Sequence, residues 1–226
     1  MTLKIGILAS TRGSDIPAVL EAIKDKVVDA EVSIIIANKE CGALAVAEAY
    51  GIPHKLILSK GMEREAYDRL VAEELEKHGV ELVLLIGYMR YLSEWFVNKY
   101  RNRIMNIHPS LLPAFAGGMD LNVHQLVLDS GVKVTGCTLH FVDEGADTGP
   151  IILQATVPVE EGDTPETLKE KVQAQERKLL VEGIKLYIEG RLKVEGNKVR
   201  ILGKDDNSGE EGNEETARES DSASGN

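Results

Sequence analysis

Short apolar segments alternate with helix-like segments along most of the chain, and this alternation constrains the fold more than any other feature. The segments at 3–9, 31–37 and 81–88 are rich in Val, Ile and Leu without regular polar interruption. A strand is continuously apolar when both of its faces are buried, which is typical of parallel sheets covered by helices. Helix-like stretches at 15–27 and 63–78 lie between them. The pattern predicts an α/β fold in which a single doubly wound, mostly parallel sheet has helices on both faces.

The rest of the chain extends this pattern. Apolar or β-branched runs predict further strands at 54–58, 103–107, 132–142 and 150–159, and a further helix is expected at 41–50. The longest helix is expected at 164–190, where Thr164 can cap the first turn and Pro165 suits the first helical position. The sequence contains no recognisable repeat or second core, so we expect one Rossmann-like domain over residues 1–202.

Charge and composition restrict the partners of the chain. The net charge is −11, and residues 203–226 are acidic, rich in Gly, Ser and Asn, and almost free of apolar side chains. Such a segment cannot recover its ordering entropy by burial, so we expect an acidic disordered tail. An acidic body argues against nucleic-acid binding, and no apolar run has membrane-spanning length. Two cysteines without CxxC spacing fit a reducing compartment, so we expect a cytoplasmic protein.

Ligands of open α/β sheets bind beyond the carboxyl ends of the strands, so the loops there form the candidate site. The loop ASTRGSD, 9–15, could bring peptide N–H groups and a helix N-terminus to an anion, or could be an ordinary turn capped by Ser14 or Asp15. It contains neither a P-loop nor a dinucleotide fingerprint. The segment GYMRYL, 87–92, could form an apolar wall for a flat heteroaromatic ligand with a carboxylate, or could lead into a helix capped by Ser93.

The segment NIHPSLLP, 106–113, places an amide and an imidazole together at a strand end. Asn106 and His108 are two residues apart, so their side chains share a face, while Ile107 turns to the other. An amide can donate to a developing oxyanion, and an imidazolium can supply a proton or stabilise that charge. The pair favours a catalytic role over a structural one.

An acidic loop, HFVDEGADTGP at 140–150, could complete this group. Its acids are Asp143, Glu144 and Asp147. A carboxylate beside His108 would favour the charged imidazole and raise its pKa. The alternatives are a solvated acidic loop and a metal site made of His108, His140 and Asp147, in which the neighbouring amide would have no function. We therefore expect no bound metal.

Five stretches together resemble the phosphoribosylglycinamide formyltransferases, a branch of the folate-dependent formyltransferase superfamily. They are RGS at 12–14, GYMRYLS at 87–93, NIHPSLLP at 106–113, GCTLHFVDEGADTGPIILQ at 136–154 and VQAQE at 172–176. The similarity runs over roughly residues 3–193, and NIHPSLLP followed by D-x-G-P is specific to the superfamily. The resemblance implies transfer of a formyl group from 10-formyltetrahydrofolate to the amine of 5-phosphoribosylglycinamide in purine biosynthesis, without a metal.

The resemblance also implies a role for each matching residue. His108 would donate a proton and stabilise a tetrahedral intermediate, Asn106 would hold its oxyanion, and Asp147 would raise the pKa of His108. The folate site would be lined by Arg64, Met89, Arg90, Tyr91, Leu92, Asn106 and Asp143. The acceptor substrate would be bound by Thr11, Arg12, Gly13, Ser14, Asp15, Gln173 and Glu176. The first five would surround its phosphate, and Glu176 would accept from its ribose hydroxyls.

Two residues of the phosphate loop depart from the pattern of these enzymes. Thr11 stands where Gly is usual, which would restrict the backbone if a positive φ were required. Asp15 stands where Asn is usual and would repel a phosphate by about 1 kcal/mol if solvent screens the charges, an effect that Arg12 could offset. We expect substrate affinity to be affected more than chemistry.

Three other functions share parts of this pattern. A formyltetrahydrofolate hydrolase would use a similar Asn, His and Asp but usually has an additional N-terminal domain, and a methionyl-tRNA formyltransferase has a second, basic domain. An inactive folate or nucleotide binder would not need the complete set of Asn106, His108 and Asp147. We expect small-molecule substrates, a monomer or homodimer, and no nucleic-acid or membrane partner.

The composition of the tail yields a first prediction. Deletion of residues 203–226 is expected to leave the rate of formyl transfer unchanged, because an acidic segment that is almost free of apolar side chains contributes no site. Steady-state rates of the full and truncated chains measure this. A large loss of rate after truncation would show that the tail takes part in function.

Overall fold

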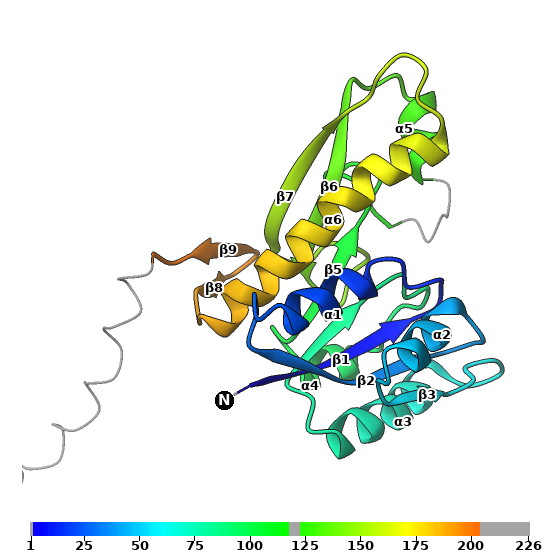
Figure 1. Cartoon of the computed structure of the whole chain (residues 1–226), viewed down its shortest axis with the longest axis vertical. Helices are drawn as coiled ribbons and strands as arrows, with labels where there is room; N and C mark the ends of the chain where they lie inside the picture. Colours follow the sequence, from blue (N-terminus) through cyan, green and yellow to red (C-terminus); the bar gives the residue numbers. More distant parts are fainter. Residues whose placement is uncertain (1, 118–122, 204–226) are drawn as a thin grey trace, which may run out of the picture.

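The computed structural model describes residues 2–117 and 123–203, which form one nine-stranded sheet with helices around it (Figure 1). The strands are β1 Leu3–Ala9, β2 Ala30–Ala37, β3 His54–Leu56, β4 Leu82–Leu85, β5 Ile104–His108, β6 Val134–Phe141, β7 Ile151–Pro158, β8 Leu192–Glu195 and β9 Lys198–Ile201. The helices are α1 Ile16–Lys24, α2 Gly42–Ala49, α3 Arg64–Lys77, α4 Glu94–Lys99, α5 Val123–Asp129 and α6 Pro165–Ile188. The strand order is β3-β2-β1-β4-β5-β6-β7-β9-β8.

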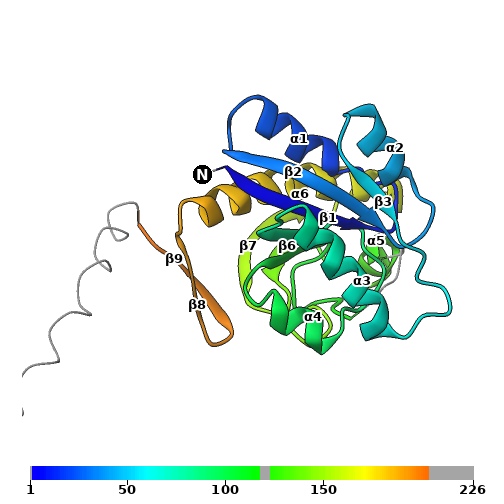
Figure 2. The same cartoon turned by 90° about the horizontal axis from the view of Figure 1, so that it is seen from below.

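Helices cover both faces of the sheet because its central strands are apolar on both faces. The helices α1, α2, α5 and α6 pack on one face, and α3 and α4 pack on the other (Figure 2). Strand β1 shows the alternation: Ile5 and Ile7 belong to the larger core with α1 and α6, and Leu8 belongs to the smaller core with α3. The predicted doubly wound α/β fold is confirmed.

The direction of winding reverses between β1 and β4. The strands β3, β2, β1, β4 and β5 pair in parallel, whereas β6 runs antiparallel to β5, and β7 antiparallel to β6. The chain moves outward from β1 to β3, crosses back to β4 and continues outward to β5. In sheets of this kind the crevice beyond the carboxyl ends of the two central strands is where ligands bind.

The loops that follow β1 and β4 are bonded directly to each other. Ser10 N donates to Gly87 O at 3.0 Å, and Met89 N donates to Ser10 Oγ at 2.8 Å. Gly87 has a φ of 61°, and a Cβ at this position would lie 2.1 Å from Thr11 Oγ1. The two loops therefore form one continuous wall above the reversal point.

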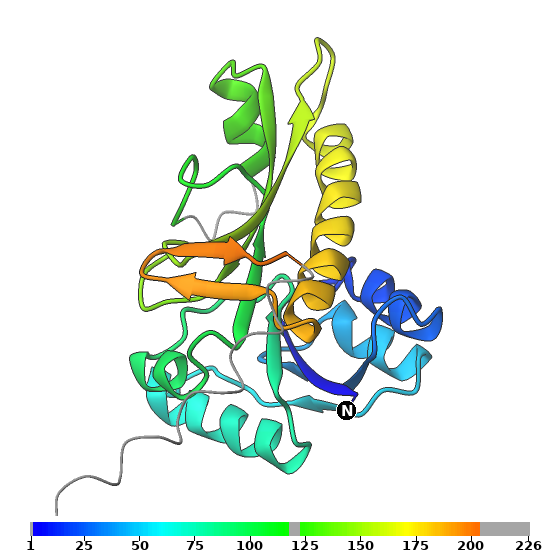
Figure 3. The ribbon, with the colours of Figure 1, turned by 90° about the vertical axis from the view of Figure 1, so that its left-hand side faces the viewer.

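The predicted strands and helices are confirmed, with ends that differ by a few residues. Ser93 Oγ accepts from Phe96 N at 3.3 Å and caps α4, so the segment 87–92 does lead into a capped helix. The structure adds α5 and a hairpin of β8 and β9, which Figure 3 shows beside the end of α6. These short strands alternate charged with apolar residues and have no long apolar run to predict them.

The chain after the hairpin is described only as far as Gly203. Leu202 N donates to Arg191 O at 2.9 Å and closes the hairpin. The expected tail at 203–226 otherwise lies outside the described residues, so the domain limits and the tail stay predictions. None of the helices within the described ranges combines the length and apolar character needed to cross a membrane.

Gly136 of β6 lies too close to β7 to carry a side chain. A Cβ at this position would lie 1.9 Å from Ala155 O, a backbone atom that cannot rotate away. Gly136→Ala is expected to lower the free energy of unfolding by about 3 kcal/mol, because the strands must separate. Urea unfolding measures this, with Val134→Ala as control, since Val134 is 52% exposed on the same strand. The free energy of unfolding of the control should fall by less than about 1 kcal/mol. Equal losses in the two variants would contradict the prediction.

Candidate active site

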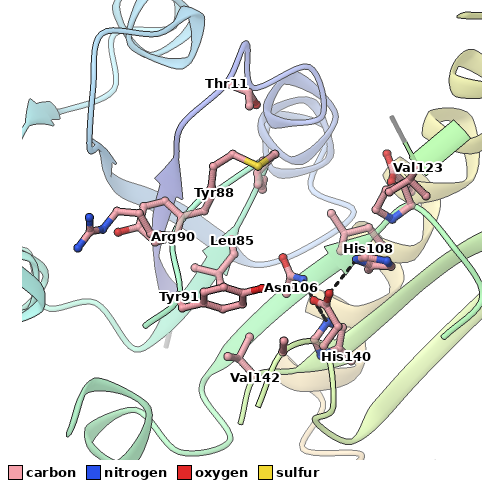
Figure 4. A pocket seen from close by; sticks show the side chains of 18 of the residues that line it. Thr11, Leu85, Tyr88, Arg90, Tyr91, Asn106, His108, Val123, His140 and Val142 are labelled. Carbon is pink, nitrogen blue, oxygen red and sulfur yellow. Dashed lines mark hydrogen bonds and ion pairs between the residues drawn. The ribbon is translucent and has the colours of Figure 1, made fainter. Parts of the chain in front are cut away.

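A cavity of about 730 Å³ opens above the reversal point (Figure 4). Every residue predicted for the site except Gly13 lines it: Thr11, Arg12, Ser14, Asp15, Arg64, Met89, Arg90, Tyr91, Leu92, Asn106, His108, Asp143, Asp147, Gln173 and Glu176. Gly13 lies buried within the same loop, with a φ of 66° that suits the predicted tight turn. The predicted site residues are therefore brought together, while the role of each one stays a prediction.

The pairing of β5 with β6 places four polar side chains on one face. Asn106 lies opposite His140, and His108 lies opposite Thr138. Antiparallel partners point to the same face of a sheet, so His140 stands beside the predicted amide and imidazole. Figure 4 shows Asn106, His108 and His140 turned toward one another at the base of the cavity. His108 is only 5% exposed.

The Asp147 carboxylate lies between two imidazoles. Its Oδ2 is 3.3 Å from His108 Nδ1, and its Oδ1 is 3.7 Å from His140 Nε2. Oδ2 also accepts from Gly117 N at 3.1 Å. Burial acts to raise the pKa of Asp147, but its interactions with His140, His108 and the Gly117 N–H outweigh it and hold that pKa below its usual value. The carboxylate is therefore ionised at neutral pH.

The loop that presents Asp147 has a fixed shape of its own. Asp143 Oδ1 accepts from Thr148 Oγ1 at 2.7 Å and from Gly145 N at 3.1 Å. Asp147 has a φ of 55°, a left-handed conformation that residues other than glycine seldom adopt. Such conformations persist where the surroundings determine them, often at functional sites. This arrangement differs from the alternative of a freely solvated acidic loop.

His140 orients the Asn106 amide. His140 Nδ1 lies 2.8 Å from Phe141 O, an acceptor, so this nitrogen carries the proton and Nε2 accepts. Asn106 Nδ2 donates to His140 Nε2 at 3.1 Å and to Asp147 Oδ1 at 3.4 Å. Both amide hydrogens therefore face protein acceptors, and the longer bond, to Asp147, is the one more easily exchanged for a ligand.

Opposing effects set the pKa of His108. Burial lowers this pKa below its usual value, and the Asp147 charge and a hydrogen bond to Phe115 O at 3.2 Å offset burial only in part. Asp147 raises the pKa of His108, as predicted, but the lowering by burial is larger. The imidazole is therefore neutral at neutral pH, yet both of its nitrogens face acceptors that stabilise a proton once it is taken up.

Two groups that support the site were missed in the sequence. Thr138 Oγ1 accepts from Leu112 N and from Gln154 Nε2, each at 3.0 Å, and holds the turn that follows β5. His140, expected only as an alternative metal ligand, instead orients the amide. Thr138 and His140 are two residues apart on β6, so their side chains share a face of the strand. This spacing could have indicated their place in the site only if the register with β5 had been known.

The alternative metal site has little support from the geometry. His108 Nδ1 and His140 Nε2 approach different oxygens of Asp147, and the His140 nitrogen already accepts from Asn106 Nδ2. Within the part of the chain that the structure describes, no group of three His, Cys, Asp or Glu side chains has the arrangement of a metal site.

One end of the cavity is apolar with a fixed cation. Met89 and Leu92 line this end, together with Arg64 at the start of α3. The Arg90 guanidinium lies 4.4 Å from the centre of the Tyr67 ring, which holds it in place. This end could accommodate a flat aromatic molecule that carries a carboxylate.

The other end is formed by the loop at 9–15 and α6. Ser14 Oγ accepts from Gln173 Nε2 at 2.8 Å, which joins the loop to the helix. Thr11 is not among the described residues with positive φ, so the backbone restriction considered for it does not arise.

Asp15 pairs with a cation of α6. Arg177 Nε donates to Asp15 Oδ1 at 3.1 Å. Arg12 is exposed and lines the cavity, so its expected offset of the Asp15 charge toward a phosphate stays a prediction. Glu176 is buried beside Asp15. Burial, with the charge of Asp15, raises the pKa of Glu176 to about 8. At neutral pH Glu176 is therefore a neutral acid that donates to the Asp15 carboxylate, and the pair carries one negative charge.

Comparisons with known proteins agree with this geometry. Residues 3–184 match a family model described as formyl transferase. The phosphoribosylglycinamide formyltransferase of Escherichia coli (strain K12) is 39% identical over 197 residues, which cover 86% of this chain and 92% of that protein. The crystal structure of glycinamide ribonucleotide transformylase 1 from Symbiobacterium toebii matches with a TM-score of 0.85 and 42% identity, covering 89% of this chain and 95% of that one.

A much longer protein is also similar to the chain. The trifunctional purine biosynthetic protein adenosine-3 of Bos taurus is 42% identical over 196 residues, which cover 86% of this chain but 19% of that protein. The chain thus spans about a fifth of the length of this relative. The likeness concerns one segment of the longer protein.

The contact between Asp147 and His108 predicts a shift that titration can detect. Asp147→Asn removes the negative charge that partly offsets burial, so the pKa of His108 is expected to fall further. Observation of the imidazole signals by NMR across the acid range measures this pKa in both proteins. The His54 imidazole is exposed and outside the cavity lining, so its signals serve as the internal reference. A His108 pKa that stays the same or rises would contradict the pairing.

Proposed function

The chain belongs to the formyl transferase family, and from this premise we infer that it transfers a formyl group from 10-formyltetrahydrofolate to the amine of 5-phosphoribosylglycinamide, a reaction of purine biosynthesis. The observation that carries the proposal is the convergence of Asn106, His108 and Asp147 in one cavity. On one side of this group lies the apolar end, and on the other lies the loop joined to α6. Two small-molecule substrates could thus meet at the polar group.

The reaction needs its two reactants held together and its charges stabilised. The acceptor amine attacks the formyl carbon, and the carbonyl electron pair moves onto oxygen to form a tetrahedral intermediate. Collapse of this intermediate breaks the bond to N10 of the folate, which takes up a proton as the amine loses one. Proximity and stabilisation of the oxyanion are the main sources of rate in such acyl transfers.

Asp147 and His108 are assigned to the movement of the proton. The ionised Asp147 side chain is 18% exposed and lines the cavity, so it can take the proton of the amine directly or through water. His108 Nδ1 lies beside this carboxylate, so a proton can pass between them. Nε2, which faces Phe115 O in the unliganded protein, would turn to the substrate and donate to the oxyanion or the departing nitrogen.

Asn106 is assigned to the oxyanion. Its Nδ2 makes a long contact of 3.4 Å with Asp147, and exchange of this contact for the formyl oxygen costs little. The shorter contact with His140, at 3.1 Å, would keep the amide oriented during the exchange. The amide can thereby become a preorganised donor without a change of rotamer.

The two ends of the cavity fit the two substrates. The apolar surface of Met89 and Leu92 suits the folate rings, and Arg90 with Arg64 suits its carboxylates. We assign the segment 89–92 and the loop that carries Asp143 to folate on this basis. At the other end, Ser14, Gln173 and Glu176 offer hydrogen bonds to the phosphate and ribose. This polar end favours transfer to a ribotide over hydrolysis, which needs no acceptor site.

Formyl transfer to 5-phosphoribosylglycinamide is expected to exceed hydrolysis of 10-formyltetrahydrofolate measured without the acceptor. His108→Ala is expected to lower kcat about 100-fold or more, because the intermediate loses its donor. The free energy of unfolding, measured in urea, should show that the variant is folded. His54→Ala, at an exposed histidine outside the cavity lining, should keep the rate of the unchanged protein. Hydrolysis faster than transfer would refute the function, and a fully active His108→Ala variant would refute the mechanism.

A further inference from the structure

We propose that Lys169 of α6 binds the phosphate of the acceptor substrate and supplies the positive charge that remains at this end of the cavity once Arg177 has paired with Asp15. The inference deepens the proposed function and rests on it, because that function supplies the phosphorylated substrate. Lys169 is not among the residues that the sequence predicted for the site.

Lys169 lies on the face of α6 that lines the cavity. Lys169, Gln173 and Glu176 follow at intervals of four and three residues, so they share one face of the helix, and all three line the cavity. The bond from Gln173 Nε2 to Ser14 Oγ, at 2.8 Å, brings this face against the loop. The Lys169 side chain, one turn earlier on the same face, is therefore directed to the phosphate end of the cavity.

The Lys169 side chain makes no ion pair with the residues that the structure describes. Among residues 2–117 and 123–203, no carboxylate lies within 4.0 Å of the Lys169 ammonium. The neighbouring cations of α6 are occupied: Lys171 contacts Glu160 at 2.8 Å, and Arg177 contacts Asp15 at 3.1 Å. A half-buried lysine that lines a cavity and has no counter-ion within the described part of the chain suits an anionic ligand.

The charged groups around Lys169 leave its positive charge available to a ligand. Burial raises the pKa of Asp15 and of Glu176, and the charge of Lys169 opposes this rise, while it adds to the lowering of the His124 pKa by burial. The ammonium thus acts on the loop, on its own helix and on α5. Asp15 and Glu176 together carry one negative charge, and Arg177 offsets it. Burial, followed by the charge of Lys169, lowers the pKa of His124 to about 4, so this imidazole is neutral. Lys169 thus remains as the uncompensated positive charge inside this end of the cavity, while Arg12 lies exposed at the loop.

The test is calorimetric binding of ribose 5-phosphate, which carries the phosphate and sugar but requires no catalysis. Lys169→Gln is expected to weaken binding about tenfold, because one charge-assisted contact to the phosphate is lost. Lys169→Arg keeps the charge and should stay within about threefold of the unchanged protein. Lys171→Gln removes a cation of the same helix that pairs outside the cavity, and it should stay within about twofold. Added salt should weaken binding to the unchanged protein more than binding to Lys169→Gln.

Formyl-transfer kinetics supply a second measurement. Lys169→Gln should raise KM for 5-phosphoribosylglycinamide about tenfold with kcat within about twofold, and it should leave turnover of the dephosphorylated acceptor unchanged. Equal losses with both acceptors would indicate a structural role and overturn the inference. So would unchanged or undetectable binding of ribose 5-phosphate, or an equal loss in Lys169→Arg or Lys171→Gln. If the chain transfers no formyl group but Lys169→Gln still weakens ribose 5-phosphate binding, the proposed function fails while the phosphate contact stands.

Discussion

The antiparallel register between β5 and β6 is the constraint on which the site depends. Pairing of Asn106 with His140 and of His108 with Thr138 puts the amide and both imidazoles on one face, at the edge where the parallel sheet ends. Strand β6 begins beyond that edge and runs back along β5, and the loop that leaves it returns Asp147 to the same place. The register of the two strands, together with this loop, is therefore what assembles the polar group.

Burial determines the charge of each group more strongly than its nearest neighbour does. Burial keeps His108 neutral despite an adjacent carboxylate, and it keeps Glu176 protonated at neutral pH. Asp147 is the exception, because donors and imidazoles surround it and hold it ionised. At rest His108 is thus a buried neutral base, Asp147 an ionised acid and Glu176 a neutral acid. Each can take or release a proton when a ligand changes its surroundings.

The sequence predicted the layers of the fold and most of the cavity lining, because both follow from local patterns. Continuous apolar strands indicate a sheet covered on both faces. The loops that follow its parallel strands meet at one edge, so their side chains can be expected to lie close together. The contacts within the site could not be predicted in the same way. The pairing of Asp15 with Arg177 joins residues far apart in the chain, and the role of His140 depends on strand register. The net pKa of His108 depends on the packing around it, which no spacing in the sequence reports.

The carboxylate of Asp15 is matched by residues on α6. Arg177 on the helix binds this carboxylate. The next residue toward the start of the helix, Glu176, shares its proton with Asp15, so two acids add a single charge. The loop at 9–15 and the helix are joined by the bond between Ser14 and Gln173, which keeps these groups in register. A carboxylate that would repel an anion in isolation therefore becomes part of a balanced set, and the loop cannot be evaluated apart from the helix that packs on it.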